Sequence, residues 1–443
     1  MSPDRDHPRR SSTALLTDRY ELTMVSAALA DGSADRRCVF EVFARSLPHG
    51  RRYGVVAGTG RLLELLADFR VDEETLDGLG PVVDAATLAW LRDYRFTGDV
   101  DGYAEGELYF PGSPVLRVTG SFADAVVLET LVLSVLNHDS AVASAAARMV
   151  WAAGGRPLIE MGSRRTHEEA AVASARACWL AGFAATSNLA AGARHGVPTA
   201  GTSAHAFTLL HTTADGPDEA AAFRAQVDAL GAGTTLLVDT YDITRGIETA
   251  VAVAGPGLGA VRIDSGDLGV LARAARAQLD SLGATGTQVV VSGDLDEHAI
   301  AALRADPVDS YGVGTSVVTG SGSPTAGMVY KLVEVDGIPV AKRSSHKETR
   351  GGAKAALRAA RDTGTVVEEL VHPADEAPEP RAGDRVLTRP LLRGGEPVAD
   401  LPDLAAGREL VAAGLRSLPW EGVALSRGEA ALPTRYLRPG QAR

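Results

Sequence analysis

Short apolar runs recur through the middle of the chain, and each ends in glycine, hydroxyl-bearing or charged residues. There are seven such runs, at 157–161, 182–185, 199–200, 236–238, 260–263, 289–291 and 310–313. A parallel β/α barrel carries its ligand-binding loops at the carboxyl ends of its strands, so the repetition predicts an irregular parallel β/α barrel. A doubly wound sheet is the alternative, but the glycine fingerprint that usually follows one of its early strands is missing.

Mixed helical and extended patterns precede the barrel. Residues 15–21 look like a helix start, with Asp18 as N-cap, Glu21 closing a capping box and Gly32 ending the helix. Extended runs predict strands at 38–43, 100–106 and 115–118. A long Ala- and Leu-rich stretch then predicts helix over 124–155, with a break at 137–140.

Composition changes along the chain predict the domain organisation. After about residue 344 the sequence is charged, rich in Pro and Gly, and too short to bury a core alone. We expect this segment to pack back on the N-terminal domain, which gives an α/β fold with a second α/β (α+β) domain formed from both termini. The expected segments are a disordered tail over 1–12, an N-terminal domain over 13–118, the barrel over 119–344 and a C-terminal segment over 345–443.

The overall composition excludes several classes of protein. The formal net charge of -12 over 443 residues argues against nucleic acid or an anionic membrane as a partner. No apolar run approaches the ~20 residues of a membrane span. Cys38 and Cys178 are the two cysteines, with no metal-like spacing, so we expect neither a disulfide framework nor zinc, and we expect a cytoplasmic location.

The stretch Val261 to Leu268 carries the densest chemistry. Arg262 and Asp264 stand two apart, so their side chains leave the same face of a strand. A cation and a carboxylate held together suit an anionic ligand rich in hydroxyl groups. A strand-end ion pair followed by a turn explains the octapeptide alone about equally well, but the repetition of polar strand ends favours a binding site.

The later strand ends favour a phosphate ligand. Gly293 and Gly314 let the backbone approach a phosphate, and Thr315 adds a hydroxyl. His205 follows another strand end, where it is either a core histidine with satisfied hydrogen bonds or a proton shuttle or phosphoryl acceptor. No lysine stands at a strand end, which disfavours Schiff-base chemistry, and no serine stands in a nucleophile elbow.

Several motifs together resemble the nicotinate phosphoribosyltransferase family. They stand in the same order over about residues 15–331, at 17–24, 40–45, 160–165, 201–205, 262–268 and 312–315. The resemblance implies a type II phosphoribosyltransferase fold and a homodimer with shared active sites. It also implies that nicotinate and phosphoribosyl pyrophosphate give nicotinate mononucleotide and pyrophosphate in NAD salvage, with ATP hydrolysis and Mg²⁺.

The resemblance also assigns roles to individual residues. His205 matches the histidine that ATP phosphorylates, and with Arg262 and Asp264 it forms the expected catalytic set. Tyr20 matches a ring that stacks on the pyridine, commonly across the dimer interface. The expected substrate-binding residues are Tyr20, Met161, Arg164, Ser187, Thr202 and Arg262. The expected phosphate-binding residues are Gly293, Asp294, Gly314 and Thr315, and the expected metal ligands are Asp264 and Asp294.

Three positions refine this assignment. Ser187 stands where enzymes that use nicotinamide carry Asp, and a carboxylate there would repel nicotinate, so the acid is the expected substrate. Met161 stands where the family usually has Phe, and Ala145 where many members have Lys, although Arg148 is kept. The alternatives are a nicotinamide or quinolinate phosphoribosyltransferase, or a catalytically idle nucleotide-binding sensor on the same fold.

Overall fold

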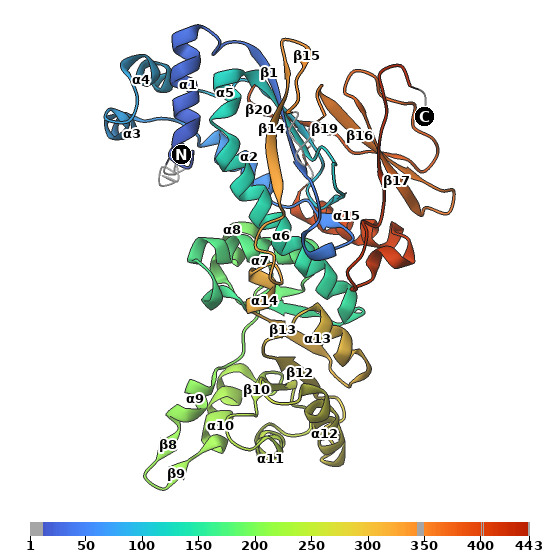
Figure 1. Cartoon of the computed structure of the whole chain (residues 1–443). Helices are drawn as coiled ribbons and strands as arrows, with labels where there is room; N and C mark the ends of the chain where they lie inside the picture. The colour runs from blue at the N-terminus through green and yellow to red at the C-terminus, as the bar shows by residue number, and fades with distance from the viewer. Residues whose placement is uncertain (1–11, 343–349, 400, 402, 442–443) are drawn as a thin grey trace, which may run out of the picture. The chain divides into compact units, whose positions relative to one another are not determined.

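The computed structural model describes residues 12–342, 350–399, 401 and 403–441 (Figure 1). The chain divides into two compact units, one formed by Met1–Ala141 with Thr325–Arg443 and the other by Val142–Pro324. The colours of both ends of the chain therefore occur in the first unit. The tail predicted over 1–12 lies outside the described residues, apart from Ser12.

The first unit contains an antiparallel sheet that joins the N- and C-terminal parts of the chain, and a second sheet built from the C-terminal part alone. One has seven strands, in the order β15 (Ile338–Pro339), β14 (Met328–Val335), β1 (Arg37–Ala44), β5 (Leu116–Ser121), β3 (Asp99–Gly102), β19 (Arg389–Arg393) and β20 (Glu396–Pro397). The second sheet has four strands, in the order β18 (Arg385–Val386), β16 (Lys354–Ala360), β17 (Val366–Pro373) and β21 (Thr434–Tyr436). Among its described pairs, only β17 and β21 run parallel. A short pair joins β2 (Gly54–Val55) to β4 (Leu108–Tyr109).

Helices of the first unit cover an apolar core. They are α1 (Arg19–Asp31), α2 (Thr59–Ala67), α3 (Glu73–Leu79), α4 (Ala85–Arg92), α5 (Phe122–Val126) and α15 (Leu404–Ser417). Phe40 of β1 stacks on Tyr330 of β14 with ring centroids 4.8 Å apart, and both rings are buried. The pairing of β1 with β14 thus brings a segment that follows the second unit in sequence into the core of the first.

The start of α1 is partly as predicted. Asp18 is the N-cap and accepts from the Arg19 N–H, and Gly32 ends the helix with a φ of 79°. The predicted capping box is wrong. The Glu21 carboxylate is buried and accepts hydrogen bonds from Thr17 and Thr130 instead.

The second unit contains a parallel sheet of six strands. Their order is β10 (Thr235–Leu237), β11 (Ala260–Ile263), β12 (Gln288–Ser292), β13 (Ser310–Val313), β6 (Leu158–Glu160) and β7 (Ala185–Thr186). The associated helices are α7 (Glu168–Ala181), α8 (Leu189–His195), α9 (His205–Leu210), α10 (Glu219–Leu230), α11 (Ile243–Ala254), α12 (Leu268–Ser281), α13 (Glu297–Ala302) and α14 (Thr315–Val318). The predicted α/β class with an irregular parallel barrel is confirmed.

The barrel is irregular because one predicted strand contributes a single bridge. Thr199 pairs with Thr186, but 199–200 forms no strand of its own. Pro198 precedes it and has no N–H to continue the ladder, although its carbonyl accepts from Thr186 N–H at 2.9 Å. The sheet is consequently open, with β10 and β7 at its edges.

The long helix α6 (Glu129–Ala153) is continuous, so the break predicted at 137–140 is wrong. The polar side chains there bond to groups outside the helix instead of competing for its backbone. Asn137 Oδ1 accepts from Met328 N–H at 2.8 Å, Arg61 pairs with Asp139 at 3.0 Å, and Ser140 Oγ accepts from Ala57 N–H at 3.1 Å.

The unit bounds differ from the predicted limits of 119 and 344. The first unit takes α6 as far as Ala141 because of these contacts, and it takes β14 because that strand pairs with β1. Residues 122–153 are long and apolar enough to span a membrane, but 67% of their most apolar window is buried within the structure. That degree of burial is typical of a core helix.

Candidate active site

Arg262 is the centre of a polar network at the carboxyl ends of β10, β11 and β12. Its side chain is 12% exposed. The guanidinium donates from Nε to Ser292 Oγ at 2.7 Å, from Nη1 to Thr202 Oγ1 at 3.0 Å and from Nη2 to Asp264 Oδ1 at 2.7 Å. The predicted pairing of Arg262 with Asp264 on one face is therefore confirmed, and Thr202 joins them.

Asp264 is held as an anion by this network. Burial disfavours its charged form, but hydrogen bonds from Ser292 and Arg262 outweigh that cost, so the pKa of Asp264 lies below its usual value. The backbone N–H of Asp264 also donates to Asp239 Oδ2 at 2.8 Å. A fixed carboxylate and a fixed guanidinium thus face the same space at the strand ends.

His205 begins α9 beside a buried carboxylate. Its Nδ1 lies 3.1 Å from Thr240 Oγ1, and its Nε2 lies 3.8 Å from Asp239 Oδ1. The histidine side chain is 42% exposed, whereas that of Asp239 is 1% exposed. Within the described residues, Asp239 Oδ1 is buried without a hydrogen-bond donor, and a small rotation of the imidazole would supply one. This histidine is accessible at the site and is not a core residue.

Of the expected phosphate-binding residues, Gly293 is the one whose position requires glycine. Its φ is +106°, and a Cβ there would lie 2.5 Å from the carbonyl oxygen of Asp264. Asp294 follows it and is exposed. Gly314 has more room, since a Cβ would lie 3.4 Å from the Met161 carbonyl, and the exposed Thr315 begins α14.

The remaining predicted residues of this unit lie on the turns after β6 and β7. Met161 packs on β13, since a Cβ at Gly312 would lie 2.8 Å from its sulfur. Arg164 lies in a 3₁₀ turn (Ser163–Arg165) and is exposed, as is Ser187 after β7. These side chains are available to a ligand.

Tyr20 belongs to the other unit. It lies in the first turn of α1 with 45% of its surface exposed. Partial burial, followed by the charge of Glu129, raises its phenol pKa above the ordinary value, so the ring carries a neutral hydroxyl. On α6, Ala145 departs from the family pattern and is buried, and the retained Arg148 pairs with Glu297 at 3.0 Å.

The expected magnesium ligands do not form a closed cage. The described part of the chain contains no group of three or more His, Cys, Asp or Glu side chains able to hold a metal. Asp264 Oδ1 already accepts from Arg262 and Ser292, and Asp294 is exposed. Mg²⁺ commonly binds through one or two carboxylates together with substrate phosphates, and these residues fit that arrangement.

Sequence reasoning placed Asp239 and Ser292 at strand ends but gave neither of them an individual role in the site. Ser292 bonds to both Arg262 and Asp264, and Asp239 connects Asp264 with His205. Their position as strand-end polar residues is the signal that could have identified them.

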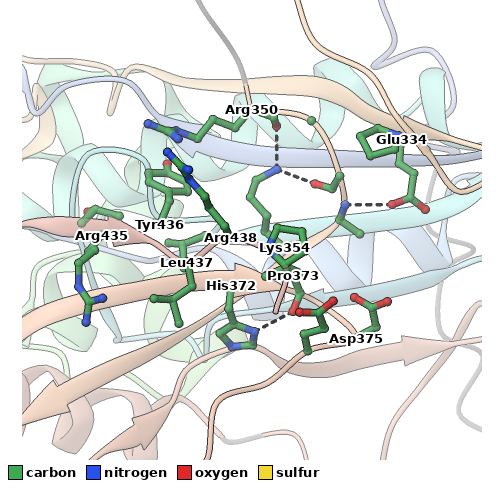
Figure 2. Close-up of a pocket in the computed structure, with 18 of the residues that line it drawn as sticks. Glu334, Arg350, Lys354, His372, Pro373, Asp375, Arg435, Tyr436, Leu437 and Arg438 are labelled. Atoms are coloured by element: carbon green, nitrogen blue, oxygen red, sulfur yellow. Dashed lines mark hydrogen bonds between the residues drawn. The ribbon is translucent and has the colours of Figure 1, made fainter. Parts of the chain in front are cut away.

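A separate cavity of about 700 Å³ lies within the first unit (Figure 2). Arg350 stacks over the ring of Tyr436 at 4.2 Å on its wall, and the Lys354 ammonium pairs with Glu41 at 2.9 Å. None of the predicted site residues lines it. The candidate active site is therefore the set of strand ends around Arg262.

Comparisons with known proteins identify the family of this chain. The nicotinate phosphoribosyltransferase (NAPRTase) N-terminal domain family matches residues 15–137. The chain is 69% identical over 438 residues to nicotinate phosphoribosyltransferase pncB1 of Mycobacterium tuberculosis (strain ATCC 25618 / H37Rv), covering 98% of this chain and 97% of the relative. It is 38% identical to the nicotinate phosphoribosyltransferase of Bacillus subtilis (strain 168), covering 73% of this chain and 67% of that relative.

A solved structure shares the fold over nearly the whole chain. The crystal structure of human nicotinic acid phosphoribosyltransferase matches with a TM-score of 0.80 and 29% identity, covering 95% of this chain and 97% of that one. Sequence and structure thus agree over both units, and the chain belongs to the nicotinate phosphoribosyltransferase family.

Proposed function

We propose that the chain transfers the phosphoribosyl group of phosphoribosyl pyrophosphate to nicotinate, giving nicotinate mononucleotide and pyrophosphate, as an entry step of NAD salvage. The observation that carries the proposal is the Arg262 network, which holds a cation and an anion side by side at the strand ends. Family membership and the relatives named above supply the identity of the substrates.

The network suits the two charges that develop during this transfer. As the bond from ribose C1 to pyrophosphate breaks, negative charge grows on the leaving group, and a fixed guanidinium stabilises it without reorganising. Mg²⁺, when bound, would add further positive charge to the pyrophosphate. Positive charge grows on the ribose, and the ionised Asp264 is placed to stabilise it. The pyridine nitrogen is the nucleophile, so no protein group has to attack carbon.

We also infer that ATP phosphorylates His205. One ring nitrogen attacks the γ-phosphorus while the bond to the ADP oxygen breaks. Asp239 lies beside Nε2 and would hold the proton there, which leaves Nδ1 to attack once it gives up its hydrogen bond to the Thr240 hydroxyl. Hydrolysis of the phosphohistidine would then drive the transfer forward.

The base used by the enzyme is tested by comparing three substrates. Purified protein is supplied with phosphoribosyl pyrophosphate, Mg²⁺, ATP and either nicotinate, nicotinamide or quinolinate, and the mononucleotide is measured. Nicotinate should be converted at least about tenfold more efficiently than the others, since Ser187 presents no carboxylate to repel the acid. Preference for another base would replace the proposed substrate, and no turnover with any of them would favour the idle sensor.

We further propose a cytoplasmic homodimer in which Tyr20 completes the pocket of a partner subunit. The exposed ring of Tyr20 supports a pocket shared between subunits. Cys38 and Cys178 are free and buried, which supports a cytoplasmic location. Tyr20→Ala and Arg262→Ala proteins, each impaired alone, should regain part of the activity when their subunits exchange, because one mixed site carries neither mutation. Verified heterodimers without recovery would mean that Tyr20 serves its own barrel or is only a surface ring.

A further inference from the structure

A second buried carboxylate, that of Glu160, lies at the end of β6. The residue is 0% exposed. Its Oε1 accepts from the Gly162 N–H, and its Oε2 accepts from the Thr186 hydroxyl at 2.5 Å. Among the described residues Glu160 has no ion-pair partner, and both groups that donate to its carboxyl are neutral. Burial therefore raises the pKa of Glu160, because the charged form is costly in the core. Such a group is expensive to keep in a core, which indicates that it has a role beyond packing.

The bonds made by Glu160 continue into the turn after β7. Asn188 N–H donates to Thr186 Oγ1 at 3.0 Å, and Asn188 Nδ2 donates to Ser163 Oγ at 3.0 Å. Asn188 is also the N-cap of α8, accepting from Ala191 N–H at 2.9 Å. These hydrogen bonds run from Glu160 to Thr186, from Thr186 to Asn188 and from Asn188 to Ser163. Because Ser163 is only three residues after Glu160 in the chain, the bonds and the backbone between Glu160 and Ser163 together form a closed ring.

The same turn is pressed against the loop after β13. A Cβ at Gly162 would lie 2.3 Å from Val318 Cγ1, 2.9 Å from Glu160 Oε1 and 3.0 Å from the Gly314 carbonyl oxygen. The turn after β6 therefore has no free space on this side. Its position is fixed jointly by the Glu160 carboxylate and by the start of α14.

We propose that Glu160 is a positioning residue that sets the turn carrying Arg164 against the turn carrying Ser187, and that it thereby determines recognition of the base. It does not touch the substrate, because it is fully buried. Met161 and Arg164 lie in the turn that follows Glu160. Ser187 lies between Thr186 and Asn188, which both belong to the ring. The inference rests on the proposed function, in which these side chains contact nicotinate.

Substitutions can separate this role from a structural one. In Glu160→Gln one carboxyl oxygen becomes an NH2 group, which only donates, so the side chain can no longer accept from Gly162 N–H with one atom and from the Thr186 hydroxyl with the other. Thr186→Val removes the hydroxyl while keeping the shape, and Thr186→Ser keeps the hydroxyl. Glu169→Gln, on an exposed ion pair with Arg194, is the matched control.

Steady-state kinetics with each substrate varied in turn provide the test. For Glu160→Gln and Thr186→Val, KM for nicotinate should rise about tenfold and the preference for nicotinate over nicotinamide should fall, because losing one hydrogen bond of this kind costs about that factor. KM for phosphoribosyl pyrophosphate should stay within about threefold, and Thr186→Ser and Glu169→Gln should behave as wild type.

Hydrogen exchange gives a second readout that is independent of activity. Peptides covering 161–165 and 186–189 should exchange faster in Glu160→Gln, while β11 keeps its protection. Variants that lose only thermal stability, with unchanged KM values and no selective exchange, would overturn the inference. Failure of the proposed function is distinct, since the wild-type protein itself would then make no nicotinate mononucleotide.

Discussion

Arg262 donates to four acceptors, which are the side chains of Thr202, Asp264 and Ser292 and the carbonyl of Ser203. A rigid fork with five N–H groups can do this, whereas a lysine ammonium has three donors and a different shape. The residue links the ends of β11 and β12 to the loop at 202–203 and presents its charge to the same space as Asp264. The chemistry at the residue scale therefore depends on geometry that a conservative cation does not reproduce.

Replacement of Arg262 should consequently affect turnover more than folding. We expect Arg262→Lys and Arg262→Ala to lower kcat/KM about 10²-fold or more, because a charge that stabilises the leaving group is displaced or lost. Arg273→Ala is the control. It removes a side chain of α12 that forms an ion pair with Asp306, and the variant should remain active. A folded Arg262→Ala protein with wild-type kinetics would remove this strand end from the active site.

Glu219 provides a pH-dependent prediction. Burial, followed by the nearby Asp242 carboxylate, raises its pKa to about 7, above the ~4.3 of an exposed glutamate. Because the folded form binds the proton more tightly, its stabilising contribution is fully present below about pH 4 and is lost as the pH rises through about 7. Glu219→Gln should therefore stabilise the protein at about pH 8, by roughly 1 kcal/mol after solvent screening.

Urea denaturation at about pH 4 and pH 8 measures this effect. The gain from Glu219→Gln should be larger at the higher pH, where wild-type Glu219 is ionised in a partly buried site. Glu248→Gln replaces an exposed glutamate of α11 and should show no such difference. Equal changes at both pH values for Glu219→Gln would contradict the assigned pKa.

At the scale of elements, the sequence predicted the strands of the parallel sheet but not the order in which they pair. The apolar runs ending in polar residues correspond to β6, β7, β10, β11, β12 and β13 because buried parallel strands leave a strong local pattern. Two predictions were wrong for a different reason: residues 199–200 were expected to form a strand, and α6 was expected to be broken at 137–140. Their outcome depends on partners distant in sequence, such as Thr186 for Thr199 and Met328 for Asn137.

The turn after β12 gives a prediction at this scale. Gly293→Ala should lower activity about tenfold or more, because the new Cβ would meet the Asp264 carbonyl at 2.5 Å and push that turn from its position. Gly283→Ala is the matched control, since Gly283 also has a positive φ, of +78°, but nothing lies within 4 Å of a Cβ there.

Both variants should lose about 1 kcal/mol of stability from backbone strain, which thermal unfolding would measure. Only Gly293→Ala should show reduced turnover. Equal activity of the two variants would mean that the turn after β12 does not position the site.

At the scale of the whole molecule, a buried charge cluster joins the two ends of the chain within the first unit. Arg358 on β16 is 1% exposed and donates to Glu107, to the Leu108 carbonyl at 2.7 Å and to Glu369 at 2.6 Å. Tyr103 donates to the other oxygen of Glu369 at 2.7 Å. Composition indicated that the C-terminal segment returns to the N-terminal domain. The bonds from Arg358 to Glu107 and Leu108, and from Tyr103 to Glu369, join residues 250 or more positions apart and leave no local signal.

Breaking this cluster should destabilise the first unit strongly. Arg358→Met leaves the buried Glu369 carboxylate without its cation and Glu107 with Arg385 alone, which costs about 3–5 kcal/mol. Arg361→Ala, at an exposed position just beyond β16, should change stability by less than about 0.5 kcal/mol. Chemical denaturation of the two variants compares these values. A small loss in Arg358→Met would show that the cluster does not hold the two ends together.

For the candidate site, as for the fold, the sequence predicted individual residues but not the contacts that depend on strand pairing. Arg262, Asp264, Thr202 and His205 lie close together as their strand-end positions indicated. The roles of Asp239 and Ser292 depend on hydrogen bonds between neighbouring strands, and these require the sheet order. The ring through Glu160 likewise depends on the pairing of β6 with β7.

Phosphorylation of His205 tests the central claim most directly, because it links the site geometry to ATP-coupled transfer. The protein is incubated with γ-labelled ATP and assayed for an acid-labile, base-stable label, alongside His205→Ala and His205→Asn. Wild-type protein should incorporate up to about one phosphate per chain, which is discharged on adding nicotinate and phosphoribosyl pyrophosphate, and both variants should incorporate none. Label that persists in a folded His205→Asn protein, or a wild-type protein that takes up none while making nicotinate mononucleotide, would contradict the account.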